Sequence, residues 1–178
     1  MIYDNHSTHI GNKGVPVDPD DLQRRIQRLE DRAELRELVN RYCLAIDDSD
    51  WDALADMFAE DDQMAGVTGR AEVVKVLRSI RSGYGRTIHT ALAQTLEFPA
   101  DDQASGVVPS RGELAIAGHT VVCAMRYLDD YTRTEDGWRF AGRIIQFSYA
   151  LPWDQLAGAM TADKPVAWPG TEPQVSQL

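Results

Sequence analysis

Two polar residues have the types and surroundings expected of a proton-transfer pair. Asp47 stands at the end of a long helical pattern, and His89 stands at the start of a pattern typical of a strand. The exposed carbonyls at a helix C-terminus carry partial negative charge, which makes a carboxylate there a better proton acceptor. An imidazole gains and loses a proton near neutral pH. The pattern therefore suggests acid–base chemistry, while a polar turn and a structural histidine fit it as well.

Tyr42 precedes Asp47 by five residues, which places the two side chains about 140° apart around a helix. They can flank one pocket without touching, although Tyr42 also fits a core position. Four further residues have side chains suited either to an apolar ligand pocket or to core packing: Trp51, Phe147, Tyr149 and Met64. Strand alternation places Phe147 and Tyr149 on one face of the last predicted strand.

Length and composition indicate one folded domain. The chain has 178 residues, of which 43% are hydrophobic and 26% are charged, as in average globular proteins. Its formal net charge of −10 repels phosphate backbones and anionic lipids, so we expect neither nucleic acid nor membrane partners. No apolar run is long enough to cross a bilayer, and the N-terminus lacks a secretory signal pattern. These features predict a cytoplasmic protein.

The sequence lacks the common cofactor motifs. It contains no glycine-rich phosphate loop, no GxSxG elbow and no cluster with zinc-ligand spacing, so we expect no cofactor and no metal. Cys43 and Cys123 stand among apolar neighbours and are expected to be free, buried thiols.

Apolar periodicity predicts three helices in the first half of the chain. A short helix over 51–58, with Ser49 as its N-cap, and a third helix over 70–82 follow a long first helix that begins at Pro19. Asp31 and its charged neighbours are interpreted as the solvated face of the long helix. Apolar residues at steps of mostly three and four predict one core-facing stripe on it: Leu22, Ile26, Leu29, Ala33, Leu38, Tyr42 and Ile46.

The second half of the chain changes to a period of two. A short strand near Met64 precedes the third helix, and Pro109 indicates an edge or a bulge in its strand. Short turns join four predicted strands, at about 88–98, 106–117, 119–133 and 138–150.

Helices followed by a hairpin-linked sheet indicate an α+β fold. We expect one domain over 19–152, in which three N-terminal helices pack on a curved, mixed but mostly antiparallel sheet to form a cone-shaped α+β barrel. A flexible tail over 1–18 and a C-terminal arm over 153–178 complete the predicted organisation.

Several segments together carry a family pattern: LRELVNRY at 35–42, AIDDSDWDAL at 45–54, GR at 69–70, IHT at 88–90, YTR at 131–133 and DGWRF at 136–140. Over about residues 25–152 the chain resembles the nuclear transport factor 2-like, or SnoaL-like, superfamily. Within it, the pattern is similar to the branch of scytalone dehydratase and bile acid 7α-dehydratase. The resemblance implies a curved sheet folded around a pocket.

That branch uses an aspartate and a histidine for proton abstraction and elimination, and the resemblance implies this role for Asp47 and His89. Tyr42 is placed like a tyrosine of the bile acid enzyme. The second pocket histidine of scytalone dehydratase falls at Ala124 here, and the late-strand arginine of the bile acid enzyme falls near Phe147. The substrate therefore does not carry over with the fold.

The resemblance implies a cofactor-independent lyase, similar to a dehydratase, that acts on an apolar cyclic or polyketide-like small molecule. Two alternatives stay open, since the superfamily hosts several functions. One is an isomerase or cyclase that uses the same pocket, and the other is a non-catalytic binding or assembly subunit such as a dioxygenase small subunit. The resemblance also implies a homo-oligomer, with a trimer favoured over a dimer.

Overall fold

The computed structural model describes residues 18–159 and 166–167. Three helices form in the first half of the chain: α1 (Pro19–Asp48), α2 (Trp51–Ala55) and α3 (Arg70–Ser82). Two strands lie between α2 and α3: β1 (Phe58–Met64) and β2 (Val67–Thr68). The later elements are β3 (Thr87–Ala91), β4 (Thr95–Ala100), β5 (Gln103–Ile116), β6 (His119–Thr134), β7 (Gly137–Pro152), the 3-10 helix η1 (Trp153–Gly158) and β8 (Val166–Ala167).

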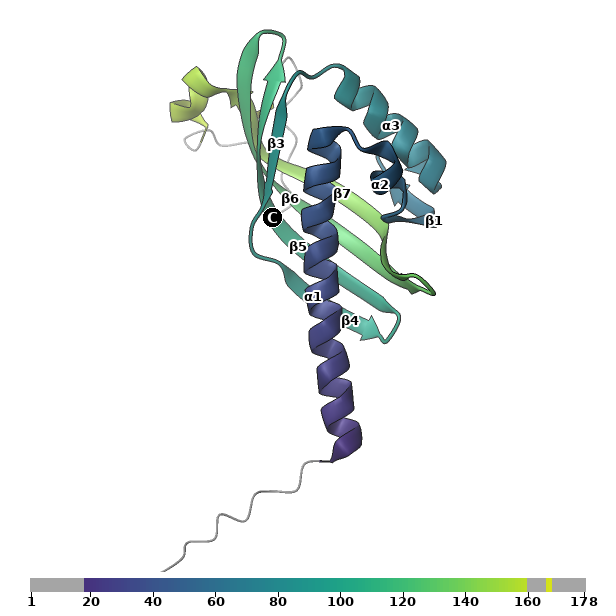
Figure 1. The fold of residues 1–178 in the computed structure, drawn as a ribbon. Helices are drawn as coiled ribbons and strands as arrows, with labels where there is room; N and C mark the ends of the chain where they lie inside the picture. The colour runs from purple at the N-terminus through teal and green to yellow at the C-terminus, as the bar shows by residue number, and fades with distance from the viewer. Residues whose placement is uncertain (1–17, 160–165, 168–178) are drawn as a thin grey trace, which may run out of the picture.

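The strands form one curved sheet with α1 across one of its faces (Figure 1). The strand order is β2-β1-β7-β6-β5-β3, with β4 also pairing with β5 and β8 pairing with β7. All pairs are antiparallel except β1 with β7 and β7 with β8. β2 and β3 stand at the two ends of this order and do not pair with each other, so the sheet stays open. The fold is thus the α+β cone that the sequence predicts.

Two strand predictions need correction. The strand predicted over 88–98 is broken into β3 and β4, and β5 lies inside the sheet between these strands and β6. The prediction of an edge or bulge at Pro109 is therefore wrong. The Pro109 carbonyl accepts a hydrogen bond from the Leu92 amide at 2.9 Å, in the break between β3 and β4. The proline nitrogen points to the same side of β5. Neither β3 nor β4 pairs with Pro109 there, so no backbone N–H is needed at this position.

Two apolar stripes run along α1 instead of one. Leu38 and Tyr42 face the core and are 1% and 3% exposed. The step of five residues from Ala33 to Leu38 turns the helix face by about 140° and separates the stripes. The prediction of a single core-facing stripe is therefore wrong for the N-terminal half of α1, which extends past the sheet in Figure 1. Its apolar residues are exposed: Leu22 at 45%, Ile26 at 41% and Leu29 at 68%.

Asp31 ties the middle of α1 to the sheet and does not belong to a solvated face. The residue is 2% exposed and forms an ion pair with Arg133 of β6. Its Oδ1 also accepts a hydrogen bond from the Trp138 indole at 3.3 Å. One turn later, Glu34 accepts the backbone N–H of Trp138 at 2.9 Å. These contacts set the angle at which α1 crosses the strands.

A second buried ion pair joins the neighbouring strands β6 and β7. Arg143 and Asp129 have fully buried side chains and make two bonds, Nε to Oδ1 at 2.6 Å and Nη2 to Oδ2 at 2.8 Å. The guanidinium carbon lies 4.2 Å from the ring centroid of Tyr42 and 4.1 Å from that of Tyr127. The Tyr131 hydroxyl donates to Asp129 at 2.7 Å. The Arg143–Asp129 ion pair therefore lies directly against aromatic rings of the core.

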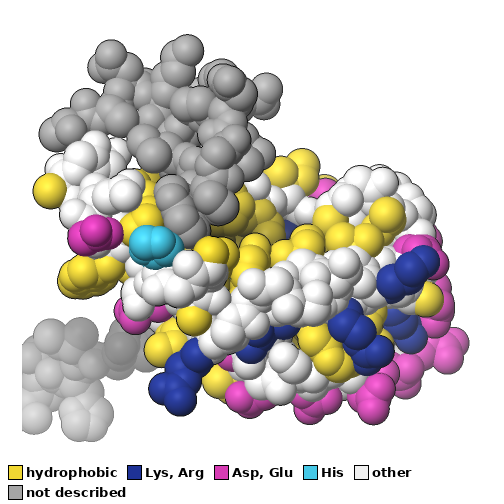
Figure 2. Space-filling view, turned by 90° about the horizontal axis from the view of Figure 1, so that it is seen from above, with side chains coloured by type: hydrophobic (Ala, Val, Ile, Leu, Met, Phe, Trp, Pro, Cys, Tyr) yellow, Lys and Arg dark blue, Asp and Glu magenta, His cyan; other side chains and the backbone are white. Residues whose placement is uncertain are grey.

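The surface carries both apolar and acidic side chains. Seen from above, hydrophobic side chains are exposed over the middle of the molecule, and acidic ones gather along one side (Figure 2). None of the helices among the described residues is long and apolar enough to cross a membrane.

Candidate active site

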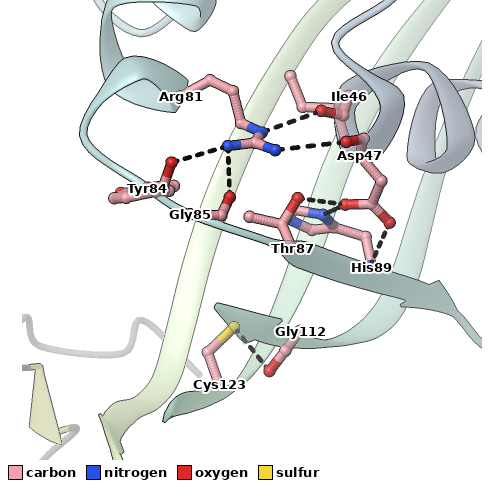
Figure 3. A network of polar contacts seen from close by, with 9 residues as sticks. All are labelled: Ile46, Asp47, Arg81, Tyr84, Gly85, Thr87, His89, Gly112 and Cys123. Atoms are coloured by element: carbon pink, nitrogen blue, oxygen red, sulfur yellow. Dashed lines mark hydrogen bonds and ion pairs between the residues drawn. The ribbon is translucent and has the colours of Figure 1, made fainter. Parts of the chain in front are cut away.

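The end of α1 brings Asp47 beside the beginning of β3. The helix stops because Ser49 adopts a left-handed backbone conformation, with φ of 58°. Asp50 then caps α2 by accepting the Ala53 amide at 3.1 Å, so the prediction of Ser49 as the N-cap is wrong by one residue. From the last turn of α1, the Asp47 side chain points at His89 (Figure 3).

Three hydrogen bonds from β3 hold the Asp47 carboxylate. Its Oδ1 accepts from His89 Nδ1 at 2.6 Å and from the Thr87 hydroxyl at 2.7 Å, and its Oδ2 accepts from the His89 backbone N–H at 2.7 Å. A carboxylate can only accept, so the proton of a neutral His89 ring lies on Nδ1 and Nε2 keeps its lone pair. The side chains of Asp47 and His89 are 17% and 15% exposed, which limits contact with bulk water.

Arg81, in the last turn of α3, lies against the C-terminal end of α1. It donates to the carbonyls of Ile46 and Asp47 at 3.3 Å each, and to those of Tyr84 at 3.1 Å and Gly85 at 2.7 Å. The negative end of the α1 dipole is thus compensated by a guanidinium, which the sequence interpretation did not foresee. The four contacts fix α1, α3 and the segment before β3 relative to one another (Figure 3).

A mainly apolar cavity lies between α1, α3 and the inner face of the sheet, with about 120 Å³ of free space. It is smaller than the pockets that usually hold drug-sized ligands. The lining residues come from six elements and the segment after α3: Tyr42, Ile46, Leu77, Ile80, Arg81, Tyr84, His89, Leu114, Cys123, Met125, Tyr127, Ile145 and Phe147.

Three of the sequence-predicted site residues meet at this cavity, and a fourth lies directly behind it. Tyr42, His89 and Phe147 line the wall, while Asp47 contacts His89 from the other side. Burial raises the pKa of the Tyr42 hydroxyl, against the opposing effect of the Arg143 charge. The hydroxyl therefore stays protonated at neutral pH and can serve as a donor.

The other predicted ligand-binding residues do not line the cavity. Trp51 lies at the start of α2, where the Arg78 guanidinium is 5.2 Å from its ring. Met64 is buried in the core at the end of β1. Tyr149 lies on β7, outside the group of residues that surrounds His89.

Tyr149 is excluded by a one-residue bulge. Phe147 pairs with Met125, whereas Tyr149 pairs with Ala124, so Ser148 is the extra residue on β7. Met125 faces the cavity, and its strand neighbour Ala124 faces the opposite side of the sheet. The predicted shared face of Phe147 and Tyr149 is therefore wrong.

Burial disfavours the thiolate form of the cavity thiol, Cys123. Burial raises the pKa of Cys123 to about 11, and its Sγ lies 3.5 Å from the Gly112 carbonyl. Cys43 and Cys123 are both free and buried, which confirms the prediction. Within the described part of the chain, no group of three or more His, Cys, Asp or Glu residues could hold a metal ion.

Sequence reasoning missed Thr87, Arg81 and Arg143. Thr87 could have been found from strand alternation, because it precedes His89 by two residues and shares its face. Arg81 carries a weaker signal, a basic residue in a last helical turn. The burial of Arg143 has no local signal, since its partner Asp129 belongs to another strand.

Comparison with known proteins shows the family to which the domain belongs. Residues 27–144 match the model of the SnoaL-like domain. The chain belongs to the SnoaL-like domain family. This match confirms the predicted family and runs from within α1 to the middle of β7. A curated relative, the protein Rv2910c of Mycobacterium tuberculosis, is 27% identical over 128 residues, which are 67% of this chain and 86% of the relative.

Solved structures of SnoaL-like proteins share the fold. A scytalone dehydratase-like protein from Novosphingobium aromaticivorans superposes with a TM-score of 0.66 at 18% identity, over 71% of this chain and 90% of the other. The hexachlorocyclohexane dehydrochlorinase LinA-type3 from Novosphingobium barchaimii superposes with a TM-score of 0.66 at 20% identity, over 71% and 92%. At these identities the likeness establishes the fold.

Proposed function

We propose that this SnoaL-like protein is a cofactor-independent lyase that removes water from a small, largely apolar cyclic or polyketide-like molecule. The observation that carries the proposal is the 2.6 Å contact between His89 Nδ1 and Asp47 Oδ1 in a wall of an apolar cavity. It orients one imidazole nitrogen and leaves the other, Nε2, to accept a proton from a ligand. Two fold neighbours, one named as a dehydrochlorinase and one as a scytalone dehydratase-like protein, support elimination chemistry.

In the proposed reaction, His89 Nε2 removes a proton from a carbon next to a carbonyl group. The electron pair of the broken C–H bond moves towards the carbonyl oxygen to form an enolate. As the enolate collapses, a carbon–carbon double bond forms and a hydroxyl group leaves from the neighbouring carbon. The His89 imidazolium returns its proton to that hydroxyl, which departs as water. Asp47 stabilises the imidazolium between the two transfers.

Tyr42 is the proposed donor to the enolate oxygen. Its hydroxyl is held protonated by burial, and the ring lies over the buried Arg143 guanidinium. Preorganised donors and nearby positive charge stabilise negative charge that develops on a substrate oxygen. Arg143 itself is bonded to Asp129 and lies behind the Tyr42 ring.

The proposed substrate is small because the cavity is small. Its free space of about 120 Å³ suits a compact ring more than an extended chain. Ile80, 46% exposed, is the most accessible of the lining residues and could turn aside for a larger ligand.

A panel of cyclic β-hydroxy ketones, analysed by product mass, tests the proposal. We expect the wild type to release products lighter by one water, and His89→Ala to lose roughly 10²–10⁴-fold in rate. An active protein in which His89→Ala has no effect would refute the assignment. A His89-dependent product of unchanged mass would instead indicate the isomerase or cyclase alternative. Ligand binding without turnover across the panel would favour a binding subunit.

A further inference from the structure

The N-terminal half of α1 exposes an apolar stripe. Leu22, Ile26 and Leu29 are 45%, 41% and 68% exposed, and they lie on the side of α1 opposite to its core residues. This part of the helix extends past the sheet in Figure 1. Isolated helices shorter than about 12–15 residues are marginally stable in water. A partner along the stripe would therefore stabilise the N-terminal half of α1.

The stripe has the spacing of a coiled coil. Its steps of four, three and four assign Leu22 and Leu29 to d positions and Ile26 and Ala33 to a positions of a heptad. Isoleucine at a with leucine at d favours a coiled coil of two parallel helices. We propose that two copies of this chain associate through these residues as a parallel, two-stranded coiled coil.

The charges beside the stripe select the parallel orientation. Arg25 occupies a g position and Glu30 the following e position, so in a parallel pair Arg25 faces Glu30 of the second copy. An antiparallel pair would instead bring like charges together. Arg25 and Glu30 are both exposed, and neither forms an ion pair with another described residue.

The same pattern repeats one heptad later. Arg32 at g would face Glu37 at e of the second copy, and both residues are exposed. Arg32 also donates to the Leu96 carbonyl at 3.3 Å within its own chain, so this second pair is the weaker of the two. Arg36 occupies the d position that follows Ala33, so the apolar seam ends at Ala33.

The proposed contact leaves the candidate active site free. The cavity is lined by Tyr42 and Ile46, which lie on the core side of α1 near its C-terminal end. The second copy would lie against the opposite side of the helix. Because the seam has only four apolar positions, we expect a weak, concentration-dependent dimer.

The mass of the full-length protein in solution, measured by analytical ultracentrifugation over about a hundredfold range of concentration, tests this proposal. We expect a monomer–dimer equilibrium that Leu29→Asp shifts to monomer. Ile144→Asp is the matched control, because Ile144 is similarly exposed, at 63%, but lies on the sheet. It should leave the dimer intact. A wild type that stays monomeric, or any assembly that survives Leu29→Asp, would overturn the proposal, and a trimer lost only in Ile144→Asp would place the contact on the sheet.

The orientation is tested separately by charge exchange. Arg25→Glu and Glu30→Arg should each weaken the dimer about tenfold or more, and the double variant should recover it, because the pair is restored between copies. Oxidation of Leu29→Cys should also link two chains, whereas Arg24→Cys on the other side of the helix should not. The buried native thiols do not interfere. Single exchanges without effect, or equal linkage of both cysteine variants, would contradict the parallel coiled coil.

Discussion

Asp47 does two things for His89 at once. Its Oδ1 accepts from the imidazole and its Oδ2 accepts from the backbone amide of the same residue, so the ring and its strand are positioned by one carboxylate. Thr87 adds a hydroxyl donor at 2.7 Å. A ring held this way needs little reorganisation to accept a proton, which is the property that a general base requires.

We expect Asp47→Asn to lower turnover by roughly 10²–10⁴-fold while the protein stays folded. The amide cannot stabilise an imidazolium, and its NH₂ group can turn the neutral ring to the wrong tautomer. Turnover of a substrate from the panel and circular dichroism provide the measurements. Asp48→Asn, the exposed neighbour, is the matched control and should keep full activity. Equal rates for the two variants would remove Asp47 from the mechanism.

At the scale of elements, the site depends on how α1, α3 and β3 meet. Arg81 binds four carbonyls from the end of α1 and the segment after α3. Helix ends and turns leave carbonyls without partners, and a guanidinium can satisfy several of them together. The geometry of the Asp47–His89 pair therefore depends on the neighbouring contacts by which Arg81 holds the end of α1 against the segment after α3.

We predict that Arg81→Met lowers the free energy of unfolding by about 2 kcal/mol, because partly buried carbonyls lose a charged donor. Activity should fall as well, since the end of α1 is no longer held against β3. Arg78→Met offers a control on the same helix, where only a ring contact at 5.2 Å is lost, and should cost no more than about 1 kcal/mol. Urea denaturation of both variants measures the difference. Similar costs would show that Arg81 does not brace the junction.

At the scale of the whole molecule, the burial of one carboxyl group makes the stability of the fold depend on pH. Asp62 is 0% exposed, and neither carboxylate oxygen has a hydrogen-bond partner among the described residues. Desolvation by burial raises its pKa to about 6. Between about pH 4 and pH 6 the folded protein therefore binds more protons than the unfolded chain, and this residue makes stability fall as pH rises through that window.

We expect Asp62→Asn to raise the free energy of unfolding at pH 7 by up to about 3 kcal/mol, because the shift in pKa sets that limit. The gain should shrink below pH 6 and disappear below about pH 3, where the carboxyl is protonated in both the folded and the unfolded state. Thermal unfolding across this pH range measures it. Asp61→Asn, the exposed neighbour, should show a much smaller dependence, because its charge is only a minor cause of the raised pKa of Asp62. A gain that does not vary with pH would exclude titration of Asp62 as the cause.

Local pattern was enough to predict most of the helices and strands and the central Asp and His of the site. The helix over 70–82 and the order of helices before strands follow from periodicities of three to four residues and of two. These periodicities depend only on neighbours along the chain. The family resemblance, which is also a matter of sequence, pointed to Asp47 and His89 as partners.

Contacts between distant segments were decided only by the tertiary structure. Asp47 and His89 lie 42 residues apart, and their 2.6 Å contact requires α1 to cross the sheet at one angle. One extra residue at Ser148 turned Tyr149 away from the cavity, and one step of five residues turned the first stripe of α1 outward. A single inserted position reverses the face of a strand or rotates that of a helix, so such outcomes depend on pairing register and packing, which local periodicity does not contain.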